Sequence, residues 1–480
     1  MRRILTAVVI LIILAVGGFF WLTTFGAQEQ QVAIERGPNG SISIGKPPPS
    51  PEPGSNPTRG GEPKSATPPR PPDPGLETNL TSDDMLSTDE ILGIEAESVE
   101  PQEFIVTEEA IVMPAPNEDF IEVPLYFGTN RQLLATPSGD APADQFNDVN
   151  GPLRYGFATV TLPKNHQRGV LESQGWFAAL IFEPNPAKHV ILRDMYVADK
   201  DEVFSFVQND LANQQDAILL YVHGFNTSLD KATRRAGQLT YDLDWNGPSF
   251  LFSWPSQGAG LDYFIDSTLA ERSYGAMAEM LEDLTDQNPG QVVVIAHSMG
   301  TRVLSHGLAR LAARNPDAAN KITSVILAAP DIDEEVFRND LAPQFRALTG
   351  PQFTLYASAE DSALTISKKA NGFPRIGDTT NGVPEIEGIE VIDASTTQSN
   401  FFEHTYFAES TSILSDVYLM IQKCTPLTGR ETVQHMAKIG DARPVAVSTL
   451  TEEQQAQAQM FWQINDGIDL DQPIDDLCAN

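Results

Sequence analysis

Ser298 stands at the junction between an apolar run and an amphipathic pattern. The residues before it, 292–296, are apolar and mostly β-branched, which is typical of a buried strand. After it, apolar side chains between Val303 and Leu311 recur at the spacing of one helix face. The sequence therefore predicts a strand, a sharp turn that carries a serine, and a helix. A serine hydroxyl presented on such a turn can act as a nucleophile toward an acyl carbon.

The residues two before and two after Ser298 fit this interpretation. The turn brings their backbones close to neighbouring elements, so both must be small, and they are Ala296 and Gly300. The motif is one methyl group away from the Gly-x-Ser-x-Gly nucleophile elbow of α/β-hydrolases. We therefore expect an α/β-hydrolase fold with Ser298 as its nucleophile, and we expect His297 to pack within the elbow.

A second apolar run, residues 217–222, predicts a strand that ends at His223-Gly224. In this fold the loop after the third strand supplies one main-chain N–H of the oxyanion hole, and the residue after the nucleophile supplies the other. Phe225 and Met299 are therefore the expected donors, through the main chain and not the side chain.

The catalytic base is expected late in the chain, because the order in this fold is serine, acid, histidine. His306 lies eight residues beyond Ser298 on the predicted helix, about 12 Å away, which is outside hydrogen-bond reach. His404 follows residues 388–394, whose alternating pattern predicts the final strand. His435 lies in a polar stretch beyond that strand. We expect His404 to be the base, with His435 as the alternative.

The acid of the triad has two candidate positions. Asp361 lies just past the strand predicted at 352–358, where a carboxylate would orient the imidazole and stabilise the imidazolium. Asp331 and Asp333 follow the preceding strand, predicted at 322–328. We expect Asp361 to be the acid, and Asp331 or Asp333 is the alternative.

These residues need a scaffold of alternating strands and helices. About eight strands over roughly 300 residues predict one doubly wound, mostly parallel sheet with helices on both faces. Residues 256–264 follow the fourth strand, where this fold carries lids and pocket walls, and Trp254, Tyr263 and Phe264 could line a pocket. Strands are predicted near 155–162, 177–182, 218–222, 249–253, 292–296, 322–328, 353–358 and 389–394, and helices at 228–242, 267–286 and 298–314.

The chain resembles a bacterial α/β-hydrolase family that is catalogued as a domain of unknown function, for which an esterase- or lipase-like activity is assumed. The resemblance covers roughly residues 120–410. It implies the fold, and it implies that Ser298 and His404 are catalytic, but it supplies no substrate. The similar segments are 125–131, 155–166, Tyr-Val-His-Gly-Phe-Asn at 221–226, Phe-Ser-Trp-Pro-Ser at 252–256, Ala-His-Ser-Met-Gly at 296–300, Ala-Ala-Pro-Asp-Ile-Asp at 328–333 and His-Thr-Tyr-Phe at 404–407.

The first residues predict a membrane anchor. Residues 4–25 are apolar or neutral and follow two arginines. About 20 such residues can span a bilayer, whereas signal-peptide cores run about 7–15. Phe25 does not suit the −3 position of a cleavage site, although a cleaved signal with a mature chain beginning near Gln28 is the alternative. Because no basic residue follows until Arg36, we expect a single-pass bacterial inner-membrane protein with its catalytic domain in the periplasm.

The rest of the chain sets the expected domain plan. Residues 37–75 contain 13 prolines and predict an extended tether, and the acidic stretch up to about 120 predicts disorder. Cys424 and Cys478 are the chain's two cysteines, and an oxidising periplasm would allow them to bond. We expect an anchor at 1–25, a disordered linker at 26–118, the hydrolase domain at 119–422 and a polar C-terminal extension at 423–480.

Composition excludes several function classes. The net charge is −34 with no basic cluster, so nucleic acid is not an expected partner. The sequence has no metal-ligand motif and no phosphate- or dinucleotide-binding glycine pattern, so no cofactor is expected.

We therefore expect a serine hydrolase, carboxylesterase- or lipase-like, acting on a small-molecule or lipid-like ester through an acyl-enzyme. The alternative is a non-catalytic exported binding or scaffold protein that keeps the fold. The presence of serine, acid and histidine in this order favours the enzyme.

Overall fold

The computed structural model describes residues 35–36, 42–43, 119–174, 183–257, 263–397, 406–440 and 442–466. The expected anchor, most of the expected linker, His404 and Cys478 lie outside these residues. Within the described part, no helix has both the length and the apolar character that crossing a membrane requires. The chain divides into two units, residues 1–102 and 103–480. In the first, β1 (Glu35–Arg36) pairs antiparallel with β2 (Ile42–Ser43).

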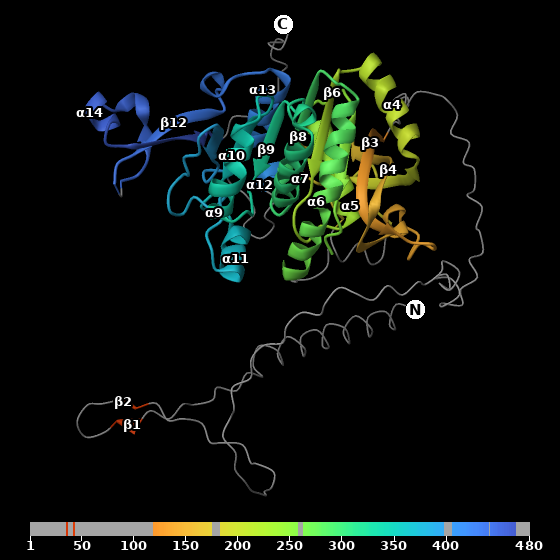
Figure 1. The fold of residues 1–480 in the computed structure, drawn as a ribbon, viewed down its shortest axis with the longest axis horizontal. Coiled ribbons are helices and arrows are strands. Elements are labelled where there is room, and N and C mark those ends of the chain that lie inside the picture. Colours follow the sequence, from red (N-terminus) through yellow and green to blue (C-terminus); the bar gives the residue numbers. More distant parts are fainter. Residues whose placement is uncertain are drawn as a thin grey trace, which may run out of the picture. The chain divides into compact units, whose positions relative to one another are not determined.

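The second unit is built on a twelve-stranded sheet in the order β13-β12-β14-β11-β10-β9-β8-β6-β7-β3-β4-β5 (Figure 1). Its eight central strands in sheet order, β14-β11-β10-β9-β8-β6-β7-β3, are parallel to one another. At one side β4 runs antiparallel to β3 and β5, and at the other β12 runs antiparallel to β13 and β14. The sheet is thus mixed and wider than the eight strands expected. Its strands are β3 (Phe120–Leu133), β4 (Phe146–Pro163), β5 (Ile191–Ala198), β6 (Ala217–Val222), β7 (Ser249–Ser253), β8 (Gln291–His297), β9 (Ser324–Ala328), β10 (Gln352–Ala357), β11 (Ile389–Asp393), β12 (Val433–Lys438), β13 (Val445–Ala446) and β14 (Gln459–Ile464).

Helices cover both faces of the sheet, and the alternation of side chains along each strand explains why the central strands are apolar throughout. Val292 and Val294 of β8 point into the core under α6 and α7, whereas Val293 and Ile295 point into the core under α5 and α13. The helices are α4 (Lys200–Asn213), α5 (Leu229–Asp242), α6 (Tyr263–Asp286), α7 (Gly300–Arg314), α8 (Pro316–Ala319), α9 (Glu334–Val336), α10 (Ala342–Arg346), α11 (Ser362–Asn371), α12 (Tyr406–Glu409), α13 (Thr411–Gln422) and α14 (Glu452–Gln455), with short helices η1 (Pro142–Gln145), η2 (Phe337–Leu341), η3 (Leu427–Gly429) and η4 (Val447–Thr449).

The expectation that residues 389–394 form the last strand is wrong. β14 pairs in parallel with β11, and β12 pairs with β14, so the C-terminal region extends the sheet. His435, which we expected beyond the last strand, lies within β12 and stacks on Trp462 with 4.7 Å between the ring centroids. The polar and apolar residues of these strands alternate only weakly, so the sequence pattern did not predict them.

Candidate active site

The turn predicted at Ser298 lies between β8 and α7, at the carboxyl edge of the parallel strands. Ser298 has φ of +53°, a left-handed conformation that is unusual for a residue with a side chain. Asn226 and Ala329, which follow the ends of β6 and β9, also have positive φ, at 52° and 48°. Such backbone strain costs about 1–3 kcal/mol per residue and gathers at functional sites. At this edge of the sheet, positive φ angles occur in the serine turn and in the loops after the neighbouring strands β6 and β9.

Main-chain bonds hold Ser298 in this conformation. Its N–H donates to the carbonyl oxygen of Ala328 at 2.9 Å, and its own carbonyl accepts from the hydroxyl of Thr301 at 2.6 Å. The serine is therefore fixed both to the neighbouring strand β9 and to the first turn of α7. The turn occupies two residues, so the helix begins at Gly300 and not at Ser298 as expected.

Close packing explains the small residues of the motif. A Cβ on Gly300 would lie 2.2 Å from the carbonyl oxygen of His223, and a Cβ on Gly224 would lie 2.8 Å from the Cβ of Ser298. A side chain at either position would push the loop after β6 away from the elbow. These two glycines therefore allow residues 223–227 to lie directly against the serine.

The N–H groups of Phe225 and Met299, expected to bind the oxyanion, both lie in this region. Within the described residues, neither N–H donates to a protein acceptor. Met299 itself is buried at the start of α7. Two N–H groups beside one serine have the chemistry of an oxyanion hole, and their role stays a prediction.

The candidate acids differ in what they already bind. Asp361 lies at the carboxyl edge after β10, where its side chain accepts from the N–H groups of Ala363 and Leu364, both at 3.0 Å, and caps α11. Asp333 caps α9 in the same way. Both carboxylates are thus oriented by a helix N-terminus.

Asp331 is instead the centre of a buried ionic cluster. Its carboxylate accepts from the hydroxyl of Tyr263 at 2.7 Å and pairs with Arg302 at 3.0 Å and Arg375 at 3.3 Å. The hydroxyl of Ser367 also donates to it. Burial and the Asp331 charge raise the pKa of Tyr263, which keeps that phenol protonated and donating. Because two arginines and two hydroxyls occupy this carboxylate, it has little capacity left to orient an imidazole.

The histidines can be sorted by their surroundings. His404 lies outside the described residues, so its position relative to Ser298 stays a prediction. His306 stacks on Tyr274 with 4.5 Å between ring centroids, and burial lowers its pKa. His223 is fully buried beneath the loop, where burial and the Arg131 charge lower its pKa to about 3. His223 is therefore a neutral structural group whose Nε2 lies 3.1 Å from the hydroxyl of Ser253.

The three candidate pocket residues are placed differently. Trp254 is fully buried, stacks on His223 and donates from Nε1 to the His223 carbonyl at 2.8 Å, so it belongs to the core. Tyr263 is occupied in the Asp331 cluster and packs against Phe225, with ring centroids 5.6 Å apart. Phe264 is exposed. Most of the expected lid, residues 258–262, lies outside the described residues.

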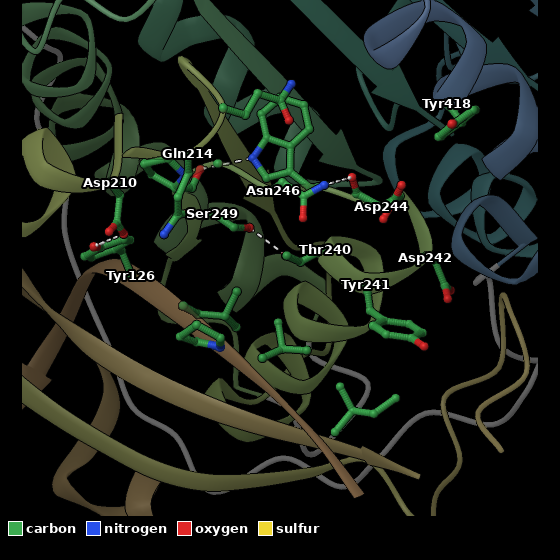
Figure 2. Close-up of a pocket in the computed structure, with 18 of the residues that line it drawn as sticks. Tyr126, Asp210, Gln214, Thr240, Tyr241, Asp242, Asp244, Asn246, Ser249 and Tyr418 are labelled. Atoms are coloured by element: carbon green, nitrogen blue, oxygen red, sulfur yellow. Dashed lines mark hydrogen bonds between the residues drawn. The ribbon is translucent and has the colours of Figure 1, made fainter. Parts of the chain in front are cut away.

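A large cavity of about 1040 Å³ lies elsewhere (Figure 2). It is lined by residues at the amino ends of β3 and β7, including Tyr126, Asn246 and Ser249. Because these strands are parallel to β8, this end of the sheet is opposite the edge that carries Ser298. Some of its polar groups are bonded to one another, as in the Tyr126–Asp210 bond of 2.6 Å. This cavity is therefore separate from the candidate site.

Two buried charged residues behind the loop were not identified as functional from the sequence. Arg131 lies in β3 and Asp266 in the first turn of α6, and both are almost fully buried. For Arg131 the sequence did carry a signal, because it ends the family-like segment 125–131. For Asp266 it carried none, because an acidic residue in the first turn of a helix is common. Among the described residues, no group of three or more His, Cys, Asp or Glu gathers that could hold a metal ion.

Comparisons with known proteins agree with this architecture. Residues 199–423 match the family described as "Alpha/beta hydrolase of unknown function (DUF900)". A curated relative, the uncharacterized protein alr1448 of Nostoc sp., is 41% identical over 61 residues, which is 12% of this chain and 16% of that protein. The matched family segment runs from just before α4 to just after α13 and contains Phe225, Ser298, Asp361 and His404. Residues 199–423 are thus similar to the alpha/beta hydrolase family of unknown function DUF900, as the sequence motifs indicated.

Proposed function

We propose that this domain is a serine hydrolase that cleaves an ester-type acyl bond. Ser298 would attack the carbonyl carbon, and His404 would take the proton from its hydroxyl. The N–H groups of Phe225 and Met299 would stabilise the oxyanion, and Asp361 would orient His404. Water, activated by the same histidine, would then release the acyl group and restore the serine.

The observation that carries this proposal is the strained conformation of Ser298. A serine at φ of +53° is costly, because glycine would adopt the same turn more easily. Met299 follows the serine and Phe225 follows Gly224, which packs against it, and the N–H groups of both have no acceptor among the described residues. A scaffold protein with the same fold would gain nothing from this arrangement.

The test is the hydrolysis of p-nitrophenyl esters of increasing acyl length. Wild-type protein is expected to turn over at least one of them, and Ser298→Ala is expected to reduce kcat to background. The matched control is Ser305→Ala, because Ser305 is buried on α7, the helix that follows Ser298, and its hydroxyl makes no hydrogen bond within the described residues. If circular dichroism shows that Ser298→Ala is folded and the variant still hydrolyses the ester at the wild-type rate, the proposal is contradicted. The range of acyl lengths accepted would separate a lipid-like from a small-molecule substrate.

We also propose that residues 4–25 anchor the protein in a bacterial inner membrane with the hydrolase domain in the periplasm. The apolar character of this segment and the arginines before it support the proposal. A reporter enzyme fused after residue 60 should be active only in its periplasmic form. A soluble mature protein that begins near Gln28 would instead demonstrate a cleaved signal.

A further inference from the structure

Asp266 is a buried carboxylate in the first turn of α6, and it is 2% exposed. Its Oδ2 accepts from the N–H of Asn226 at 3.1 Å and from the hydroxyl of Ser256 at 2.6 Å. Its Oδ1 accepts from the N–H of Gln257 at 3.0 Å. One side chain therefore binds both the loop that follows β6 and the loop that follows β7.

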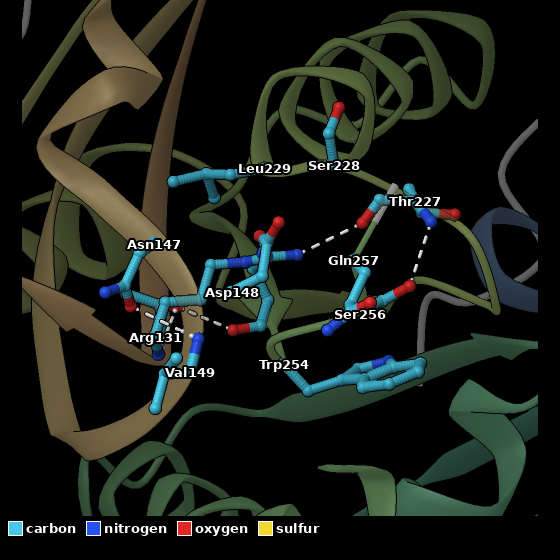
Figure 3. A network of polar contacts seen from close by, with 12 residues as sticks. Arg131, Asn147, Asp148, Val149, Thr227, Ser228, Leu229, Trp254, Ser256 and Gln257 are labelled. Atoms are coloured by element: carbon cyan, nitrogen blue, oxygen red, sulfur yellow. Dashed lines mark hydrogen bonds and ion pairs between the residues drawn. The ribbon is translucent and has the colours of Figure 1, made fainter. Parts of the chain in front are cut away.

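The next residue of the loop after β6 is held by the same network. The N–H of Thr227 donates to the Ser256 hydroxyl at 2.9 Å, and the Thr227 carbonyl accepts from Nη2 of Arg131 at 3.1 Å (Figure 3). Arg131 also pairs with Asp148. Figure 3 shows these bonds converging on Thr227 from two sides, from β3 and from the loop after β7. The bonds from this network to the loop after β6 are thus made to the main chain of Asn226 and Thr227.

These bonds fix the residue that follows Phe225. Asn226 has φ of +52°, and the direction of the Phe225 N–H depends on the backbone of this turn. Burying a carboxylate costs free energy unless its charge is compensated. Arg131 attracts Asp266 electrostatically, but its guanidinium is paired directly with Asp148. The helix N-terminus and three donors stabilise the charge, and all three donors belong to the two loops beside the elbow.

We propose that Asp266 is a positioning residue for the oxyanion hole, which it holds in place through Asn226, Ser256 and Thr227. This proposal rests on the proposed serine-hydrolase function. Asp266 does not touch the substrate. It fixes the main chain that aims the Phe225 N–H at the oxyanion.

The test is Asp266→Asn in the full chain. Asparagine keeps the size of the side chain, but one of its two acceptor oxygens becomes an NH₂ group that faces a main-chain N–H. The turn is expected to move, and kcat for a p-nitrophenyl ester is expected to fall about 100- to 1000-fold, since loss of one oxyanion donor costs roughly that much. KM is expected to stay within about threefold, because the oxyanion forms only in the transition state. Hydrogen exchange of the amides at 225–227 is expected to become faster.

Asp283→Asn is the matched control. Asp283 lies on the same helix, is also buried, accepts from Tyr155 at 2.7 Å and pairs with Lys200 at 2.5 Å, and neither partner belongs to the two loops. The Asp283→Asn substitution is expected to lower stability without changing kcat or the rate of hydrogen exchange of the amides at 225–227. Equal losses of kcat in the two variants would overturn the proposal, and so would wild-type kcat or unchanged exchange in Asp266→Asn.

Ser256→Ala decides the matter if Asp266→Asn does not fold. It removes the hydroxyl that links Asp266 to Thr227, and a smaller loss of kcat in the same direction, with unchanged KM, is expected. A Ser256→Ala variant with wild-type kcat would then overturn the proposal. Failure of the proposed function is distinguishable, because wild-type protein would itself hydrolyse no ester.

Discussion

At the scale of single residues, Asp331 and Asp361 both follow parallel strands at the edge that carries Ser298. Sequence alone left both as candidates for the triad acid. They differ in their partners: Asp331 pairs with Arg302 and Arg375, whereas Asp361 accepts from main-chain N–H groups of α11. The partners of Asp331 come from distant parts of the chain, so no local pattern could reveal them. The two residues are therefore expected to respond differently to the same substitution.

Asp361→Asn is expected to lower kcat about 10⁴-fold with little change in stability. The catalytic loss follows from the wrong orientation and tautomer of the histidine. Asparagine caps a helix as well as aspartate does, so α11 should be unaffected. Steady-state kinetics and urea unfolding of the same preparation measure both effects.

Asp331→Asn should show the opposite pattern. It leaves the buried guanidinium of Arg375 and the partly buried guanidinium of Arg302 without their counter-charge, and breaking a buried pair costs about 3–5 kcal/mol. Its unfolding free energy should therefore drop while the folded fraction keeps a kcat near that of the wild type. If Asp331→Asn loses turnover and Asp361→Asn keeps it, the acid lies on the earlier strand.

His166 provides a pH-dependent contribution to stability. Its Nε2 lies 2.9 Å from Asp242 and its Nδ1 lies 2.8 Å from Glu172. Burial alone would lower its pKa, but the bonds and charges of Asp242 and Glu172 outweigh burial and raise it. A raised pKa means that the contribution is complete below the ordinary value of about 6.5 and is lost as pH rises through the folded-state pKa.

The difference in unfolding free energy between wild type and His166→Gln should therefore be largest near pH 6 and shrink toward pH 8.5. Urea unfolding across this range measures it. A difference that grows with pH would show that His166 is neutral in the folded protein.

At the scale of elements, the central strands and the elbow could be predicted because each is encoded locally. A continuous apolar run, an abrupt polar turn and a helical apolar spacing are all visible around Ser298. β12 and β14 could not be predicted in this way, because their residues alternate weakly. Their place in the sheet depends on distant partners, such as the bond of 2.8 Å from Gln463 to Asp393.

Arg430 links this C-terminal region to the core by two ion pairs. It is fully buried and pairs with Asp416 of α13 at 3.2 Å and with Glu390 of β11 at 2.8 Å. Arg430→Ala leaves Asp416 buried without a cation and is expected to cost about 3–5 kcal/mol. Arg346→Ala, which breaks the exposed pair with Glu387, should cost about 0–1 kcal/mol. Similar unfolding free energies for the two variants would show that the C-terminal strands do not depend on this link.

At the scale of the whole molecule, the C-terminal region is part of the hydrolase sheet and carries a covalent constraint. Cys424, just after α13, is disulfide-bonded, and the chain's other cysteine is Cys478, which lies outside the described residues. A bond between them would close a loop of about 54 residues, for which chain entropy gives about 4 kcal/mol. Protein made by export should therefore show no free thiol when it is denatured and alkylated without reductant. Two alkylated cysteines would show that the bond does not form.

The central claim is that Ser298 is a nucleophile at the carboxyl edge of this sheet. The most direct test is to incubate the folded wild-type protein with a fluorophosphonate and to locate the adduct by peptide mass spectrometry. The account predicts one phosphonyl group on Ser298, no adduct on Ser298→Ala, and full labelling of Ser305→Ala. Folded wild-type protein that takes up no phosphonyl group, or takes it up at another serine, would contradict the account.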